Sequence, residues 1–200
     1  MTEIIIPDPD NFLLDSLTLY APVQVNRSAW TGRRKVVGGT GAEIWRGKAT
    51  IDTIATEEEE RPWRAFLFGM RGPANWFKWM LPPQSHIGGR PTVAAGATSG
   101  YSLPLSGMLA NATILRAGQF MTVPLPSGHK RTVCLTTDLR TDGAGNATAA
   151  FEPALNETPT LAATVETAAP YIPMSPVEPT QGLDSADGVS GASFDVEEAM

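Results

Sequence analysis

The sequence has little charge and a single cysteine, and both shortages restrict what the chain can be. Charged residues make up 18% of its 200 residues, against about 25% in an average soluble domain. Such a surface is often covered by partners, although a neutral surface rich in alanine, glycine and threonine would have the same composition. Cys134 is the only cysteine, so no internal disulfide can form, which fits synthesis in a reducing cytoplasm.

Basic stripes and long apolar runs are missing as well. The net charge is −6 at pH 7 and the only dense basic run is residues 33–35, which argues against nucleic-acid recognition. Three basic residues beside a glycine-rich stretch are more often solvated than functional. Every apolar run is far shorter than the ~20 residues that span a bilayer. No signal peptide is expected, because no basic region followed by an apolar stretch begins the chain.

Few residues could carry catalysis or hold a metal. Neither His86 nor His129 has Cys, Asp or Glu at metal-ligand spacing. Residues 138–149 faintly resemble a calcium loop, but Arg140 and Ala149 occupy ligand positions, so a hairpin turn is preferred. Cys134 lies in an alternating run, which favours a buried thiol. We therefore expect no catalytic residue, metal or cofactor, and an enzyme that uses Cys134 or His129 stays only as a third alternative.

One helix is predicted after residue 56. Thr56 and Glu59 form a capping box, and residues 57–60 place four glutamates at the positive end of the helix dipole. Pro62 is tolerated only in the first turn, so the helix is expected to start nearer residue 59 than residue 57. The apolar positions follow helical spacing and predict one face that packs on the core: Trp63, Phe66, Leu67 and Met70.

The rest of the chain is predicted to form mainly short strands. Alternation and turn residues predict strands over 43–55, 75–81, 113–116, 120–125, 130–135 and 147–151. Residues 17–25 also alternate, but Pro22 confines them to an edge or a break. Gly38, Gly39 and Gly41 predict a mobile loop or a hairpin tip. One helix among many strands predicts a β-dominated α+β class with a two-sheet core.

Trp76 and Trp79 are candidate interface residues. They lie three apart in a predicted strand, so their side chains should face opposite ways and at most one should enter the core. The other would suit an interface anchor. Aromatic residues that bind sugar or stack on bases are the alternative.

The predicted organisation is one β-rich domain over residues 1–160, followed by an extended C-terminal arm over 161–200 that could add a final strand. Residues 84–112 are rich in Gly, Ala, Ser and Thr, and form either a long loop or a small inserted lobe. Such an arm cannot offset its own ordering entropy, so it would become ordered on a neighbouring subunit.

The order of several short motifs is similar to that of a known family. A strand with Trp45 precedes the glutamate-rich helix entry and residues 63–72; residues 81–83, 115–118, 138–145 and 151–155 follow in turn. This order resembles siphophage and prophage minor tail proteins of the distal-tail type. The resemblance covers somewhat more than half of the chain, and the order of the motifs carries it rather than any one of them.

The resemblance implies a tail-tube-like split β-barrel with a flanking helix and extended terminal arms, without catalytic residues. It implies a structural virion protein at the tail tip, in a homo-oligomeric ring with six-fold symmetry (a hexamer), that links the tail tube protein to the tail-tip hub proteins. The alternative is a monomeric β-rich module that binds carbohydrate through Trp76 or Trp79. Rings would favour the first hypothesis, and fluorescence changes with glycans the second.

Overall fold

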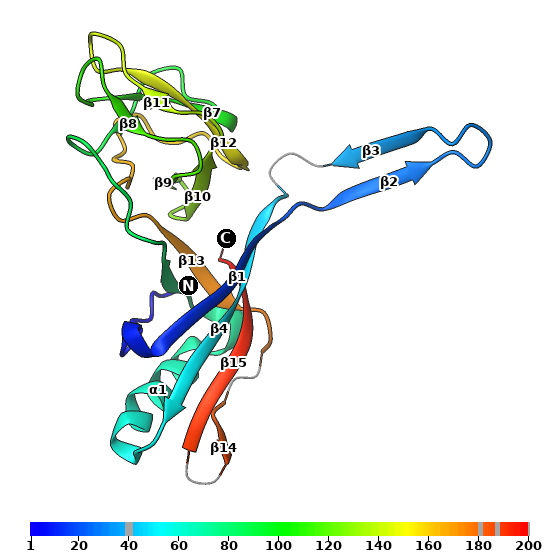
Figure 1. Ribbon diagram of the computed structural model, residues 1–200, viewed down its shortest axis with the longest axis vertical. Coiled ribbons are helices and arrows are strands. Elements are labelled where there is room, and N and C mark those ends of the chain that lie inside the picture. The colour runs from blue at the N-terminus through cyan, green and yellow to red at the C-terminus, as the bar shows by residue number, and fades with distance from the viewer. Residues whose placement is uncertain (39–41, 180–181, 187–188, 200) are drawn as a thin grey trace. The chain divides into compact units, whose positions relative to one another are not determined.

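The computed structural model describes residues 1–38, 42–179, 182–186 and 189–199. It confirms the β-dominated α+β class: 47% of the chain is strand and 11% is helix, and the sheets curl into half-barrels. The chain divides into two compact units, shown together in Figure 1. Unit 1 comprises Met1–Thr18, Trp45–Met80 and Tyr171–Met200, and unit 2 comprises Leu19–Ile44 and Leu81–Pro170.

Unit 1 is built on a six-stranded sheet with the order β1-β4-β15-β13-β5, in which β14 pairs with β15. The strands are β1 (Phe12–Tyr20), β4 (Ile44–Ile54), β5 (Phe77–Met80), β13 (Tyr171–Pro176), β14 (Asp184–Ala186) and β15 (Val189–Glu198). The short helices η1 (Pro9–Asn11) and η2 (Gly72–Ala74) flank it. Strands from both ends of the chain thus meet in one sheet.

Helix α1 (Glu57–Met70) packs an aromatic face on this sheet. Its four apolar residues Trp63, Phe66, Leu67 and Met70 are all buried. The ring of Phe12 in β1 stacks on Trp63 with centroids 5.7 Å apart, and meets Phe66 and Phe77 edge-on at 5.8 and 5.3 Å. Offset and edge-on pairs of this kind add to the free energy gained by burial. The core of unit 1 is therefore an aromatic cluster between α1, β1 and β5.

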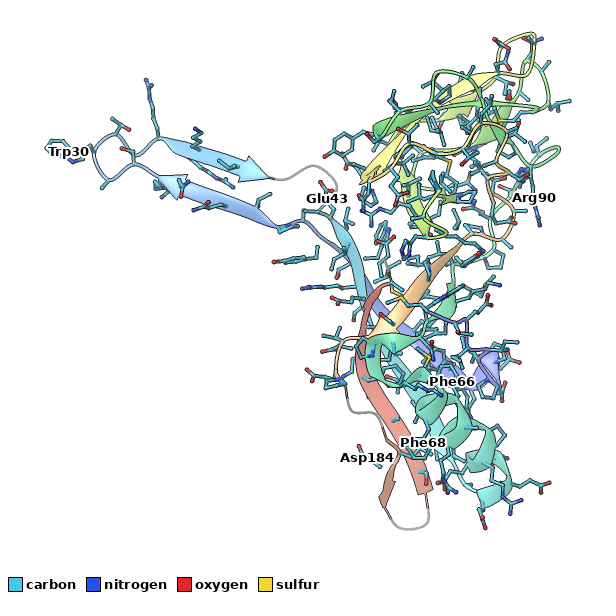
Figure 2. All side chains as sticks on the ribbon, turned by 180° about the vertical axis from the view of Figure 1, so that it is seen from behind. Trp30, Glu43, Phe66, Phe68, Arg90 and Asp184 are labelled. Carbon is cyan, nitrogen blue, oxygen red and sulfur yellow. The ribbon has the colours of Figure 1, made fainter. Side chains whose placement is uncertain are left out.

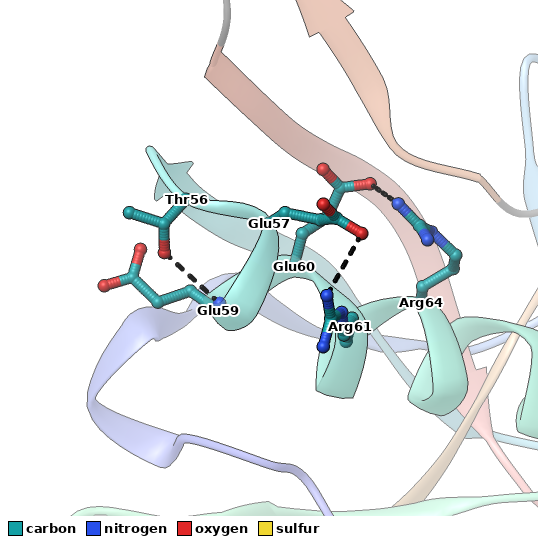
Figure 3. A network of polar contacts seen from close by, with 6 residues as sticks. All are labelled: Thr56, Glu57, Glu59, Glu60, Arg61 and Arg64. Carbon is teal, nitrogen blue, oxygen red and sulfur yellow. Dashed lines mark hydrogen bonds and ion pairs between the residues drawn. The ribbon is translucent and has the colours of Figure 1, made fainter.

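The start of α1 differs from the expectation in one respect. The helix begins at Glu57, so Pro62 lies within it rather than in its first turn. Thr56 is the N-cap, and its hydroxyl accepts a hydrogen bond from the Glu59 N–H at 3.3 Å (Figure 3). The capped first turn, with its glutamates against the helix dipole, keeps the helical conformation ahead of the proline.

Unit 2 contains a five-stranded antiparallel sheet with the order β6-β7-β12-β10-β9. Its strands are β6 (Thr92–Val93), β7 (Gly100–Ser106), β9 (Phe120–Pro124), β10 (Lys130–Leu135) and β12 (Ala147–Leu155). Two-stranded sheets are formed by β8 (Thr113–Leu115) with β11 (Leu139–Arg140), and by β2 (Val23–Arg27) with β3 (Arg34–Gly38). Mostly aliphatic residues fill the core of the larger sheet, among them Leu103 and Val133, together with the aromatic Phe151.

The domain boundaries differ from the prediction. Residues 161–200 do not form an arm, because they supply β13 and β15 to the middle of the unit 1 sheet. The expected final strand is present as β15. Residues 84–112 contain β6 and β7, which belong to the five-stranded sheet rather than to a separate lobe. In place of the predicted single domain over 1–160, the chain forms two units. Each unit is assembled from segments that lie far apart in the sequence.

Candidate functional site

The strongest candidate for a functional surface is the hairpin formed by β2 and β3. Its strands pair from Val23 opposite Gly38 to Arg27 opposite Arg34. The turn is closed by the Ser28 N–H, which donates to the Arg33 carbonyl at 2.9 Å, and by the Gly32 N–H, which donates to the Ser28 carbonyl at 3.0 Å. Gly32 has a φ of +66°, which a residue without a Cβ adopts at little cost.

The described chain buries no part of this hairpin. Every residue from Val23 to Gly38 is exposed, and Trp30 in the turn, labelled in Figure 2, is 98% exposed. An isolated two-stranded hairpin is at best marginally stable in water. A fully exposed tryptophan is also unusual, because its large apolar ring is normally buried at least in part. Tryptophan is one of the residues that most often anchor protein interfaces. Both features make this hairpin a candidate contact surface.

One face of the hairpin is both apolar and cationic. The register places Val23, Val25 and Val36 on the same face as Arg27 and Arg34, since directly opposite residues point the same way and alternate residues share a face. The three valines are about half exposed, at 52%, 47% and 49%. Valine and arginine side chains together suit a partner that offers apolar contact as well as negative charge.

The charge of the hairpin contrasts with that of the chain. Residues 23–38 contain four basic residues, which are Arg27, Arg33, Arg34 and Lys35, and no acidic residue. The whole chain has a net charge of −6, so the remainder has −6 − 4 = −10. Arg27 lies directly opposite Arg34, and like charges in that position destabilise a strand pair. A negatively charged partner would relieve this repulsion.

The segment that follows the hairpin is held by unit 2. The guanidinium of Arg131, which is only 1% exposed, donates hydrogen bonds to the carbonyls of Glu43 and, at 3.2 Å, of Ala154. The Tyr101 hydroxyl donates to the Glu43 carboxylate at 3.2 Å. Burial, and then the negative charge of Glu43, raise the pKa of the Glu152 carboxyl above its ordinary value. Glu43 is thus fixed by its backbone and its side chain on the sheet of unit 2.

The two tryptophans selected from the sequence lie at the edge of the unit 1 sheet. Trp79 in β5 is buried, with 4% of its surface exposed. Trp76 precedes β5 and is half-buried; its backbone pairs with the N-terminal segment, through the Ile4 N–H to the Trp76 carbonyl at 2.7 Å. Only Trp76 therefore leaves part of its ring available for a partner.

The residues considered for catalysis are spread along unit 2. His86 lies between β5 and β6, and His129 precedes β10. Cys134 in β10 is half-buried, and burial raises the pKa of its thiol. The Asp142 carboxylate accepts hydrogen bonds from the Ala144 and Asn146 N–H groups at 2.8 and 2.9 Å, so it closes a turn. Over the described residues, no three His, Cys, Asp or Glu side chains gather in a way that could hold a metal ion.

Two further findings bear on function. In the part of the chain that the structure describes, no helix has the length and hydrophobicity needed to cross a bilayer. No protein-family model matches the sequence, and comparison with curated proteins gives no significant match.

Sequence reasoning missed Trp30 and placed the hairpin tip too late. The tip is at residues 28–33, whereas Gly38 ends β3 and Gly39 and Gly41 lie outside the described residues. The available signal was the turn-rich stretch 28–32 between the valine-containing runs 23–27 and 34–38, a pattern typical of a hairpin with a loop of a few residues. The basic run 33–35, which the sequence suggested was merely solvated, belongs to this hairpin.

Proposed function

We propose that this chain is a structural subunit of the tail tip of a long-tailed bacteriophage, a ring-forming component between the tail tube and the tail-tip hub. In this role it has no catalytic activity; it acts in the virion by binding copies of itself and neighbouring tail proteins. Six-fold symmetry is part of the proposal and comes from the resemblance of the motif order to distal-tail proteins.

The observation that carries the proposal is the hairpin at residues 23–38. A segment whose every residue is exposed, with a tryptophan at its tip, gains little by folding on its own chain. Ordered contact with another subunit would bury Trp30 and the valines. A β-dominated fold with curled sheets supports the same role, because such a subunit can join identical neighbours through sheet edges and hairpins.

The test is the mass of the native particle. We expect the purified full-length chain to form a closed ring at micromolar concentration, seen by mass photometry and by electron microscopy. Replacing residues 23–38 with a short Gly-Ser linker should leave folded monomers, because the hairpin adds nothing to either core. A wild-type chain that stays monomeric at high concentration would contradict the proposed function.

The alternative of a carbohydrate-binding module has less to support it. Burial of Trp79 removes one of the two rings that could stack on a sugar. Trp76 is half-buried and packs beside the N-terminal segment. Titration with glycans should therefore leave the tryptophan fluorescence unchanged, and a saturable change that Trp76→Ala abolishes would favour the alternative.

A further inference from the structure

We propose that the basic hairpin of one copy docks into an acid-rimmed hollow beside the start of α1 in a second copy. This inference rests on the proposed self-assembly and specifies its contact. The two surfaces lie in different units of the chain, so each copy would present both halves of the contact.

The hollow has a volume of about 280 Å³ and is lined by Pro7, Asp8, Asn11, Thr53, Glu59, Pro62 and Trp63. Both prolines are exposed, whereas Trp63 is buried, with 2% of its surface exposed. Asp8 and Glu59 place carboxylates at its rim. The hollow therefore combines apolar walls with negative charge, which is the complement of the hairpin.

Near the hollow, the carboxylates outnumber the basic side chains that pair with them. Glu57 pairs with Arg61 at 3.4 Å, and Glu60 pairs with Arg64 at 2.5 Å (Figure 3). The Glu60 carboxylate also accepts a hydrogen bond from the Ser190 hydroxyl at 3.1 Å. The Arg64 guanidinium and then Ser190 lower the pKa of the Glu60 carboxyl. These two carboxylates are already matched within the chain, so they are not the ones that a partner would neutralise.

Two carboxylates line the hollow and form no ion pair within the described residues: Asp8 and Glu59. Both are exposed. The hairpin offers four basic residues to them. Charge complementarity of this kind steers association and sets the register of an interface.

Trp30 supplies the apolar part of the contact. Its side chain is 98% exposed in the isolated chain, and the hollow offers the exposed prolines Pro7 and Pro62 as partners. An aromatic anchor that fills a pocket, with charged residues around it, is the usual arrangement of an interface hot spot. Because the hairpin and the hollow are different surfaces, the contact is heterologous, and its repetition generates a ring or a filament.

A photo-crosslinker tests the docking directly. Trp30→p-benzoyl-phenylalanine in the full chain, labelled with ¹⁵N and mixed with unlabelled wild-type chain, should give adducts between labelled hairpin peptides and unlabelled peptides that contain residues 7–11 or 52–63. Adducts confined to one chain, or adducts to other surfaces, would overturn the inference. If rings form in the same sample with adducts elsewhere, the proposed function stands and only the docking fails; if no particle forms, both fail.

Charge exchange gives a second readout. Arg33→Glu with Arg34→Glu, and separately Asp8→Arg with Glu59→Arg, should each weaken self-association by about tenfold or more. An equimolar mixture of the two variants should recover association, because the reversed charges match again.

Arg116→Glu, an exposed change of the same sign in unit 2, serves as the matched control and should assemble like wild type. Circular dichroism checks that each variant folds. Full assembly of the Asp8 and Glu59 variant would overturn the inference.

Discussion

Gly47 in β4 lies against the buried ring of Trp79. A Cβ at this position would overlap the outer ring atoms of Trp79 and approach the Asp15 carbonyl at 3.3 Å. We expect Gly47→Ala to lower the free energy of unfolding of unit 1 by about 1–3 kcal/mol, because the ring or the strand must move in a closely packed core. Urea unfolding followed by circular dichroism at 222 nm measures this. Gly89→Ala is the control, since nothing lies within 4 Å of its Cβ; equal effects of the two changes would contradict the packing argument.

Asp142 controls the acid response of the turn before β12. The N–H groups of Asn146 and Ala144 stabilise its carboxylate, which lowers its pKa below the ordinary 3.8. Its stabilising contribution is therefore present above the unfolded-state pKa and lost as the pH falls through the lowered folded-state pKa. Asp142→Asn cannot titrate, so its urea midpoint should fall less steeply than that of wild type as the pH is lowered below the ordinary pKa of 3.8. Parallel curves for the two proteins would show that the turn does not depend on this charge.

At the scale of the element, α1 depends on its first turn. Thr56 caps the helix through the Glu59 N–H, and the helix must pass through Pro62. We expect Thr56→Ala to lower the free energy of unfolding of unit 1 by about 1 kcal/mol, the usual cost of a lost N-cap. Thr160→Ala, an exposed change outside any helix or strand, controls for the loss of a threonine. No difference between the two variants in urea unfolding at 222 nm would mean that packing of the aromatic face alone holds the helix.

At the scale of the whole molecule, the C-terminal segment is required by unit 1. β15 pairs with β4, and β13 pairs with both β15 and β5. A fragment of residues 1–160 lacks both central strands, so β1, β4 and β5 lose their common sheet and α1 loses the surface on which it packs. We expect this fragment to lose the helical signal at 222 nm, whereas replacing residues 23–38 with a linker should keep it. A 1–160 fragment with native helical content would contradict the assignment of these strands to the core.

The local pattern of the sequence was sufficient for α1 and for the strands β4, β5, β8, β9, β10 and β12. Thr56, the glutamates and the apolar spacing define the helix without reference to the rest of the chain, because capping and amphipathicity are properties of neighbouring residues. The strands of residues 120–151 follow from alternation and turn residues for the same reason. The helix start was misplaced by two residues, since Pro62 was given more weight than the capped turn ahead of it.

What only the tertiary structure decided was which distant segments meet. Residues 171–176 contain two prolines and read as an arm, yet they form a buried strand because β5 and β15 lie on either side. Trp79 lies in a short strand and Trp30 in a hairpin turn, and only long-range packing buries the first and leaves the second in solvent. The sequence by itself determined the composition and the charge of each segment, the helix, and the strands with clear alternation, because those depend on adjacent residues. The partners of each strand depend on contacts between residues far apart in the chain, which no local pattern encodes.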